Sequence, residues 1–201
     1  MTANQRPDFP DQSGVMILPW VSLFPGAMLP LKIFEERYRE MLAECLNGNR
    51  VFSIAHTLGD DSNYDPIGGL GVVRACVHNE DGTSNLVLQG LARVEFQEMR
   101  LEPYPIVRIA ILTDPIESSP KLESLRKKIT ATFESNLLKK LGIPEGFMGH
   151  LNSIQHHGAF TDLVASTVLE NPQTRRLLLE ELDVTSRMEL LQWFLNAEPD
   201  A

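Results

Sequence analysis

Cysteine is scarce in this chain. Two cysteines occur in its 201 residues, Cys45 and Cys76, and each lies within an apolar run rather than in a spacing typical of metal ligands. Small secreted domains that depend on disulfides contain many more cysteines for their length. The scarcity argues against a disulfide framework, and we expect both thiols to behave as small buried hydrophobic groups.

Long apolar runs are also missing. A membrane-spanning helix needs about 20 consecutive apolar residues, and no run in this sequence approaches that length. The first residues, Met1 to Asp8, lack the charged segment and the following apolar segment that a secretory signal needs. We therefore predict a soluble, cytoplasmic protein with no membrane partner.

Positive charge is too sparse for a typical nucleic-acid binder. The formal net charge is -9, and acidic side chains outnumber basic ones both in residues 1–115 and in residues 116–201. Proteins that bind a phosphate backbone usually present a basic face, because counterion release supplies much of the affinity. We expect no nucleic-acid partner, although RNA binding stays an alternative because barrels of the kind predicted below sometimes bind RNA.

The most informative stretch runs from Ile17 to Tyr38. Pro19, Pro25 and Pro30 each remove a backbone donor and fix φ at about -65°, so no regular ladder is expected to run through it. Gly26 permits a backbone angle that other residues avoid. We expect an extended path with short strand pieces on either side.

Residues 34–115 combine one helix pattern with several short strand patterns. Apolar residues at helical spacing follow Phe34, and Asn47-Gly48-Asn49 ends that helix. The strand-like runs are Val51–Ala55, Gly71–Val77, Asn85–Gly90, Ala92–Phe96 and Ile106–Ile111. Asn79–Thr83 contains an Asp-Gly turn signal. Short strands, short turns and one inserted helix predict an antiparallel, partly closed β-barrel.

The pattern changes to helices after Asp114-Pro115. Ser119-Pro120 is a typical helix start, and apolar residues then recur at helical spacing from Leu122 to Leu141. Asn171-Pro172 predicts the start of a later helix, and Ser186 with Glu189 forms a capping-box pattern ahead of the last one. These patterns predict a helical bundle.

The predicted fold class is therefore α+β, with a barrel followed by a helical bundle. We divide the chain into a flexible leader over residues 1–14, a β-barrel subdomain over residues 15–115 and a helical subdomain over residues 116–201.

Several segments together resemble the N-terminal substrate-binding domain of Lon proteases. They are Ile17–Tyr38, Gly68–Ala75, Asp81–Thr83, Leu86–Val94, Asp162–Ala165 and Asp183–Leu191. The likeness covers about residues 15–197, and Leu29–Tyr38 is similar to free-standing members of the family. The resemblance implies a PUA-like barrel and a capacity to bind unfolded or apolar polypeptide segments.

The resemblance implies no catalysis. A full Lon protease continues into an ATPase module with a phosphate-binding loop and a peptidase with a Ser–Lys dyad, and this sequence contains neither. We expect a stand-alone, non-catalytic member of the peptidase S16 type with no cofactor, no metal and no catalytic residue.

Other candidate sites have structural explanations. Gly68–Gly71 leads into a strand rather than the helix N-terminus that a phosphate loop needs. Ser84 follows a turn with no base placed within reach. His150 and His156 are six residues apart, unlike a zinc-binding His-x-x-x-His pair, so with His157 we expect surface or loop roles.

Three large apolar residues are the tentative peptide-binding residues: Trp20, Phe24 and Met28. Such side chains in a proline-rich segment need not all be buried, and an exposed patch of them would suit polypeptide binding. The Pro25-Gly26 pair is expected to turn the chain outward, so that Phe24 and Met28 border the functional surface. Core packing of these residues is the alternative.

Two other functions stay open. The same surface could serve an adaptor or self-association module that contacts a folded partner, such as a protease or another copy of the chain. An undetected hydrolase is the remaining possibility. The barrel and the bundle are expected to form a groove between them.

Overall fold

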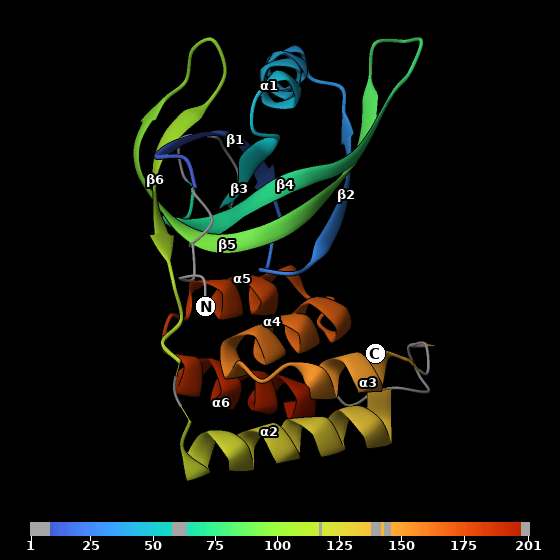
Figure 1. Ribbon diagram of the computed structural model, residues 1–201, viewed down its shortest axis with the longest axis vertical. Helices are drawn as coiled ribbons and strands as arrows, with labels where there is room; N and C mark the ends of the chain where they lie inside the picture. The colour runs from blue at the N-terminus through green and yellow to red at the C-terminus, as the bar shows by residue number, and fades with distance from the viewer. Residues whose placement is uncertain (1–8, 58–63, 117, 138–141, 143–145, 198–201) are drawn as a thin grey trace, which may run out of the picture.

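The computed structural model describes residues 9–57, 64–116, 118–137, 142 and 146–197. A β-barrel lies against one side of a helical bundle, and helix α1 (Glu36–Asn47) lies at the opposite end of the barrel (Figure 1). The predicted α+β class, with a barrel followed by a bundle, is confirmed.

Among the described residues, six strands form one mixed sheet. They are β1 (Gln12–Pro19), β2 (Met28–Ile33), β3 (Val51–Thr57), β4 (Ile67–His78), β5 (Ser84–Arg100) and β6 (Ile106–Leu112). The order is β2-β5-β4-β3-β1-β6, and an additional β5–β6 pairing closes the sheet into a ring. The barrel differs from the prediction in one pairing, because β1 and β3 run parallel. Strand β2 and helix α1 form the long connection that this parallel pair requires.

Strand β5 unites two predicted strands. Its first part pairs with β2 and its second part with β6, while β4 pairs with its residues 84–95. The sequence predicted two strands separated near Gly90. At that point the structure has a shift in the register of the β4–β5 pairing, opposite Leu70 and Gly71. An extra residue in one strand bends the sheet without ending it, so one continuous strand serves three neighbours.

The N-terminal boundary and Pro30 also differ from expectation. Strand β1 begins at Gln12, and residues 12–14 pair with β6, although we had assigned them to the leader. Residues 1–8 lie outside the described residues. Pro30 lies inside strand β2, although we had expected no hydrogen-bonded strand pairing there. It is tolerated because β2 is at the edge of the sheet, where a missing backbone donor costs little.

The second half is helical. Its elements are α2 (Pro120–Thr132), the π-helical turn η1 (Phe133–Leu137), α3 (Gly146–Ser153), α4 (His157–Val168), α5 (Pro172–Glu180) and α6 (Val184–Ala197). Within the described residues, no helix is both long and apolar enough to cross a membrane.

The helix starts follow side-chain caps. Ser119 Oγ accepts from the Leu122 N–H at 3.2 Å, and Asn171 caps α5, as predicted. The capping-box prediction for α6 is wrong, because the helix begins before Ser186. Asp183 Oδ1 instead accepts the Ser186 N–H at 2.7 Å. The side chain of Leu141, predicted to continue the α2 stripe, lies outside the described residues.

Apolar cores fill both halves. The buried face of α1 contributes Tyr38, Met41 and Leu42 to the barrel core. The bundle core includes residues of α2, α4 and α6, but it also contains Phe24, which precedes β2 in the chain. A residue from the barrel half thus completes the core of the helical half.

Candidate binding surfaces on the barrel and at its junction with the helices

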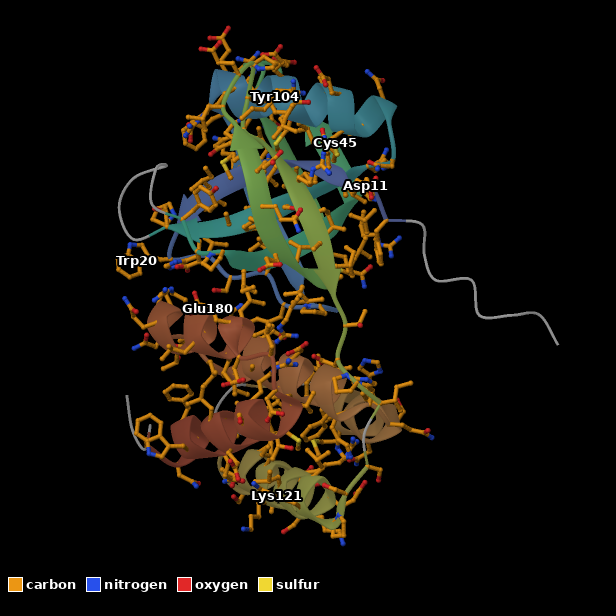
Figure 2. All side chains as sticks on the ribbon, turned by 90° about the vertical axis from the view of Figure 1, so that its left-hand side faces the viewer. Asp11, Trp20, Cys45, Tyr104, Lys121 and Glu180 are labelled. Atoms are coloured by element: carbon orange, nitrogen blue, oxygen red, sulfur yellow. The ribbon has the colours of Figure 1, made fainter. Side chains whose placement is uncertain are left out.

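Trp20 is exposed at the junction between barrel and helices. It directly follows β1, has a positive φ of 64°, and keeps 51 % of its surface exposed. Figure 2 shows it at the level where the barrel meets the bundle. Its ring meets the His56 ring edge-on, with centroids 6.0 Å apart. A bulky residue in this backbone region is uncommon.

Phe24 is fully buried, which corrects the prediction that it borders a binding surface. Its ring lies near the guanidinium groups of Arg93 and Arg175, 5.9 and 5.5 Å from the ring centroid. The Pro25-Gly26 turn folds against β5 rather than outward. The Gly26 N–H donates to the Gly90 carbonyl at 2.9 Å, and the Gly90 N–H donates to the Ala27 carbonyl at 2.9 Å.

Gly90 allows this close approach. A Cβ at Gly90 would collide with the carbonyl oxygen of Phe24. The segment before β2 therefore lies directly on the backbone of β5, and Phe24 is directed into the bundle core. Of the three predicted residues, the structure exposes Trp20 and Met28 and buries Phe24.

Met28 lies on the outer face of the sheet. It is 59 % exposed and begins β2, in which Pro30 and Lys32 are exposed on the same face. Side chains alternate between faces along a strand, so Val87, opposite Pro30, lies on this outer face as well. Val77 of β4, paired with Asn85, is 62 % exposed.

These strands form a shallow groove with a volume of about 470 Å³. Its lining residues come from β2, β4 and β5: Pro30, Leu31, Lys32, Ala75, Val77, Asn85, Leu86 and Val87. We call it the outer sheet groove. Most of these side chains are apolar, and Lys32 is the charged one. Alternation along the sequence would not find this groove, because a register shift between Val73 and Ala75 moves Ala75 and Val77 away from the buried face of Val73.

A buried charge network connects barrel and bundle. Arg93 of β5 donates two hydrogen bonds to Asp162 of α4, each 2.6 Å long. Arg187 of α6 donates two hydrogen bonds to Asp114 at 2.8 Å and lies 3.6 Å from Asp162. Arg187 is completely buried. Each charge in the network faces an opposite charge, which offsets the cost of removing it from water.

This network sets the pKa of its members. Burial by itself would raise the pKa of Asp114, but its hydrogen bonds and attraction to Arg187 outweigh burial and hold that pKa below the ordinary value. Burial likewise opposes the charge of Arg187, yet Asp114 and Asp162 raise the pKa of its guanidinium. Both groups therefore stay charged.

A second polar cluster lies beneath Trp20. Arg176 of α5 donates to both oxygens of Asp65 at 2.6 and 2.7 Å and also contacts Glu180 at 3.1 Å. His56 is 2 % exposed, and its Nδ1 lies 2.9 Å from Asp65 Oδ2 without hydrogen-bond geometry. Burial and the nearby Asp65 carboxylate raise the pKa of Glu180, against the attraction of Arg176.

A cavity with a volume of about 660 Å³ lies at the connection between β6 and α2. His156 and His157 line it. His156 caps α4, where its Nδ1 accepts the Ala159 N–H at 3.4 Å. His157 is only 6 % exposed and contacts Glu123 at 3.4 Å, so it is not the surface or loop residue we expected. Within the part of the chain that the structure describes, no cluster of acidic, His or Cys side chains could hold a metal ion.

Ser84 does have a base within reach, contrary to the sequence reading. Its Oγ lies 2.8 Å from Nδ1 of His78, its cross-strand partner. The serine is 3 % exposed, so its oxygen could not approach a substrate carbonyl without local opening. The pair is best explained as a cross-strand polar contact.

Comparison with protein families adds the context for these surfaces. A family model described as the ATP-dependent protease La (LON) substrate-binding domain matches residues 14–197. The Lon protease of Roseiflexus castenholzii is 25 % identical over 204 residues, covering 98 % of this chain and 25 % of that protein. The Lon protease of Dictyoglomus thermophilum is 23 % identical over 201 residues, covering 97 % and 25 %. The chain thus spans about a quarter of the length of these curated relatives.

Solved structures share the fold. The N-terminal domain of Mycobacterium avium complex Lon protease matches with a TM-score of 0.77 at 18 % identity, covering 94 % of this chain and 100 % of that one. A Lon N-terminal domain protein from Xanthomonas campestris matches with a TM-score of 0.69 at 20 % identity, covering 91 % and 98 %. At these identities the matches establish the architecture.

Proposed function

This chain belongs to the Lon substrate-binding domain family, and from that premise we propose that it binds polypeptide segments with exposed apolar side chains and performs no chemistry on them. The observation that carries the proposal is the outer sheet groove. Contiguous apolar surface on a folded protein commonly marks an interaction site. Met28 lies on the same face as this groove, and Trp20 offers a separate exposed aromatic surface at the junction.

Met28 and Trp20 suit such a role in different ways. A methionine side chain is flexible and polarizable, so it can adapt to several apolar partners. Trp20 presents a large rigid ring that loses little conformational entropy on binding. Both can be replaced without emptying a core, because each keeps more than half of its surface exposed. The expectation of a cytoplasmic location, drawn from the sequence, stays a prediction.

The experiment is a binding titration with an unfolded polypeptide. A reduced, carboxymethylated protein that cannot refold would be labelled with a fluorophore, and its anisotropy measured as this protein is added. We expect saturable binding with modest affinity, because an unstructured ligand loses backbone entropy when it is ordered. Absence of saturation at high micromolar concentrations, with several unrelated unfolded polypeptides, would refute the proposal.

An adaptor or self-association module is the second candidate function. Trp193 on α6 favours it, since this ring is 61 % exposed and packs edge-on against Phe194. Aromatic residues are enriched at protein interfaces. Light scattering would reveal a dimer, and a Trp193→Ser variant should then become monomeric. Unchanged mass in the variant would exclude Trp193 from such an interface.

A further inference from the structure

The free edge of β2 is poorly suited to add a further strand. In the described residues, β2 pairs with β5 alone, so its other edge is open. Pro30 has no N–H to donate, and proline in an edge strand occupies a position whose nitrogen faces away from the sheet. Lys32 adds a charge to the same strand. Proline and lysine are both residues that commonly prevent an edge strand from pairing with another chain.

The face of the same strands is open and apolar. The groove volume of about 470 Å³ lies within the roughly 300–1,000 Å³ typical of ligand sites. Val77 is 62 % exposed, and Pro30 and Val87 lie on the same outer face, whereas Leu31 and Leu86 line the groove but pack against the barrel core. Apolar side chains of a partner can therefore pack onto the sheet face without forming backbone hydrogen bonds to β2.

Two positive side chains border the groove along its strands, and two acidic ones lie in the turn at its end. Lys32 lines it, and Arg74 lies next to it, with its Nε donating to Gln89 Oε1 at 2.6 Å. Gln89 is the cross-strand neighbour of Met28, which locates Arg74 on the outer face. Glu80 and Asp81, both exposed in the β4–β5 turn, are the acids at this end. Hydrogen bonds from Thr83 chiefly lower the pKa of Asp81, and Lys32 contributes to the lowering.

Where the strands line the groove, their charged side chains are thus positive, although the protein has a net charge of -9. Two copies meeting face to face would gain favourable charge contacts only where the Glu80–Asp81 turn of one met Lys32 or Arg74 of the other. An apolar segment bordered by acidic residues would instead meet opposite charges at both sides of the groove.

We infer that the outer sheet groove binds apolar polypeptide segments flanked by Asp or Glu, by docking on the face of β2, β4 and β5 rather than by adding a strand to β2. The inference rests on the proposed function and specifies its ligand and its surface. Val77 and Val87 supply the apolar contact, while Lys32 and Arg74 select the flanking charge.

The test uses two labelled short peptides with the same Leu/Val centre, one flanked by Glu and the other by Lys. Exposed ion pairs contribute modestly, so we expect the Glu-flanked peptide to bind about three- to tenfold more tightly at low salt. The preference should shrink at high salt because screening weakens exposed charge pairs.

Variants of this protein locate the site. Lys32→Glu should reverse the preference between the two peptides, whereas Lys128→Glu, the same change on the exposed surface of α2 far from the barrel (Figure 1), should leave it intact. Val77→Asp should weaken the Glu-flanked peptide by tenfold or more with no change in the thermal unfolding midpoint. Pro30→Val, which restores a backbone donor, should leave affinity within about twofold.

The outcomes separate this inference from the proposed function. If peptides bind but Lys32→Glu and Val77→Asp have no effect, the groove assignment is wrong and the function stands. Tighter binding to Pro30→Val would indicate strand addition and overturn face docking. A dimer that Val77→Asp dissociates would assign the groove to self-association. If neither peptide nor any unfolded polypeptide binds, both the inference and the proposed function fail.

Discussion

Arg93 and Asp162 form a two-point ion pair at the centre of the junction between barrel and bundle. Both hydrogen bonds are 2.6 Å long, and the residues are 2 % and 1 % exposed. Arg93 Nε also donates to the Leu179 carbonyl at 3.0 Å. One barrel side chain therefore contacts both α4 and the end of α5, and loss of either charge would leave the other buried with fewer partners.

Asp162→Leu should lower the free energy of unfolding by about 3–5 kcal/mol, the usual cost of removing one partner of a buried pair. Urea denaturation followed by circular dichroism measures it. The double variant Arg93→Met/Asp162→Leu should lose less than the sum of the two single variants, because no charge is then stranded. Additive losses would mean that the pair is not coupled.

Gly158→Ala should destabilise the protein by about 1–3 kcal/mol, because its Cβ would displace Asp114 from Arg187. Gly149→Ala is the matched control in another helix, since no atom lies within 4 Å of its added Cβ. That control should be neutral or stabilising by up to about 1 kcal/mol. Equal effects in the two variants would contradict the crowding argument.

Phe24→Ala should cost about 3–5 kcal/mol, as expected for emptying a core aromatic site. Met28→Ala should cost less than about 1 kcal/mol, because surface substitutions have small effects. Thermal and urea unfolding give both values. A small loss for Phe24→Ala would show that the bundle core closes without it.

Cys45 should resist alkylation. Burial raises the pKa of its thiol to about 11, although Arg50 lowers it in part. Iodoacetamide at mildly alkaline pH should label Cys76, which is partly exposed, well before Cys45. Peptide mass mapping over time distinguishes the two sites. Equal labelling rates in the folded protein would show that Cys45 is accessible.

Glu180→Gln should change how stability depends on pH. The folded pKa of Glu180 lies above its ordinary value of 4.5, so protonation stabilises the folded state. This contribution is fully present below the unfolded pKa and is lost as pH rises through the folded pKa. At pH 7 the free energy of unfolding of the variant should equal or exceed that of the original protein. At acid pH, where Glu180 itself is protonated, this difference should vanish.

A loss of stability in Glu180→Gln at pH 7 would contradict this prediction. If Glu180→Gln loses more than about 1 kcal/mol at pH 7, the ion pair with Arg176 outweighs the repulsion from Asp65. Unfolding midpoints in urea, collected at several pH values for both proteins, show whether the variant is stabilised or destabilised at pH 7.

Local sequence patterns predicted the helices and strands well, but they did not predict which of these elements pack against each other. Ser119-Pro120 and Asn171-Pro172 marked two helix starts, because a cap depends only on residues within one turn. The burial of Phe24 could not be predicted in this way. It depends on Gly90 and on helices that follow about a hundred residues later in the chain.

The buried charge network could not be predicted from the sequence either. Arg93 and Asp162 each occur within segments that resemble the family, but nothing in their spacing of 69 residues pairs them. The parallel β1–β3 pairing was missed for a related reason, since strand patterns do not encode direction. The outer groove was also missed, because the register shift between Val73 and Ala75 reverses the faces that simple alternation along β4 would assign.

The position of Phe24 has a consequence for the order in which the chain is made. Residues 1–115 emerge from the ribosome before any of the bundle helices exist, and until then Phe24 has none of its helical neighbours. The newly made barrel therefore carries an uncovered aromatic ring that the finished protein never exposes. A truncation after residue 115 would keep that ring exposed permanently, and such a fragment should aggregate or recruit chaperones even if its strands pair correctly.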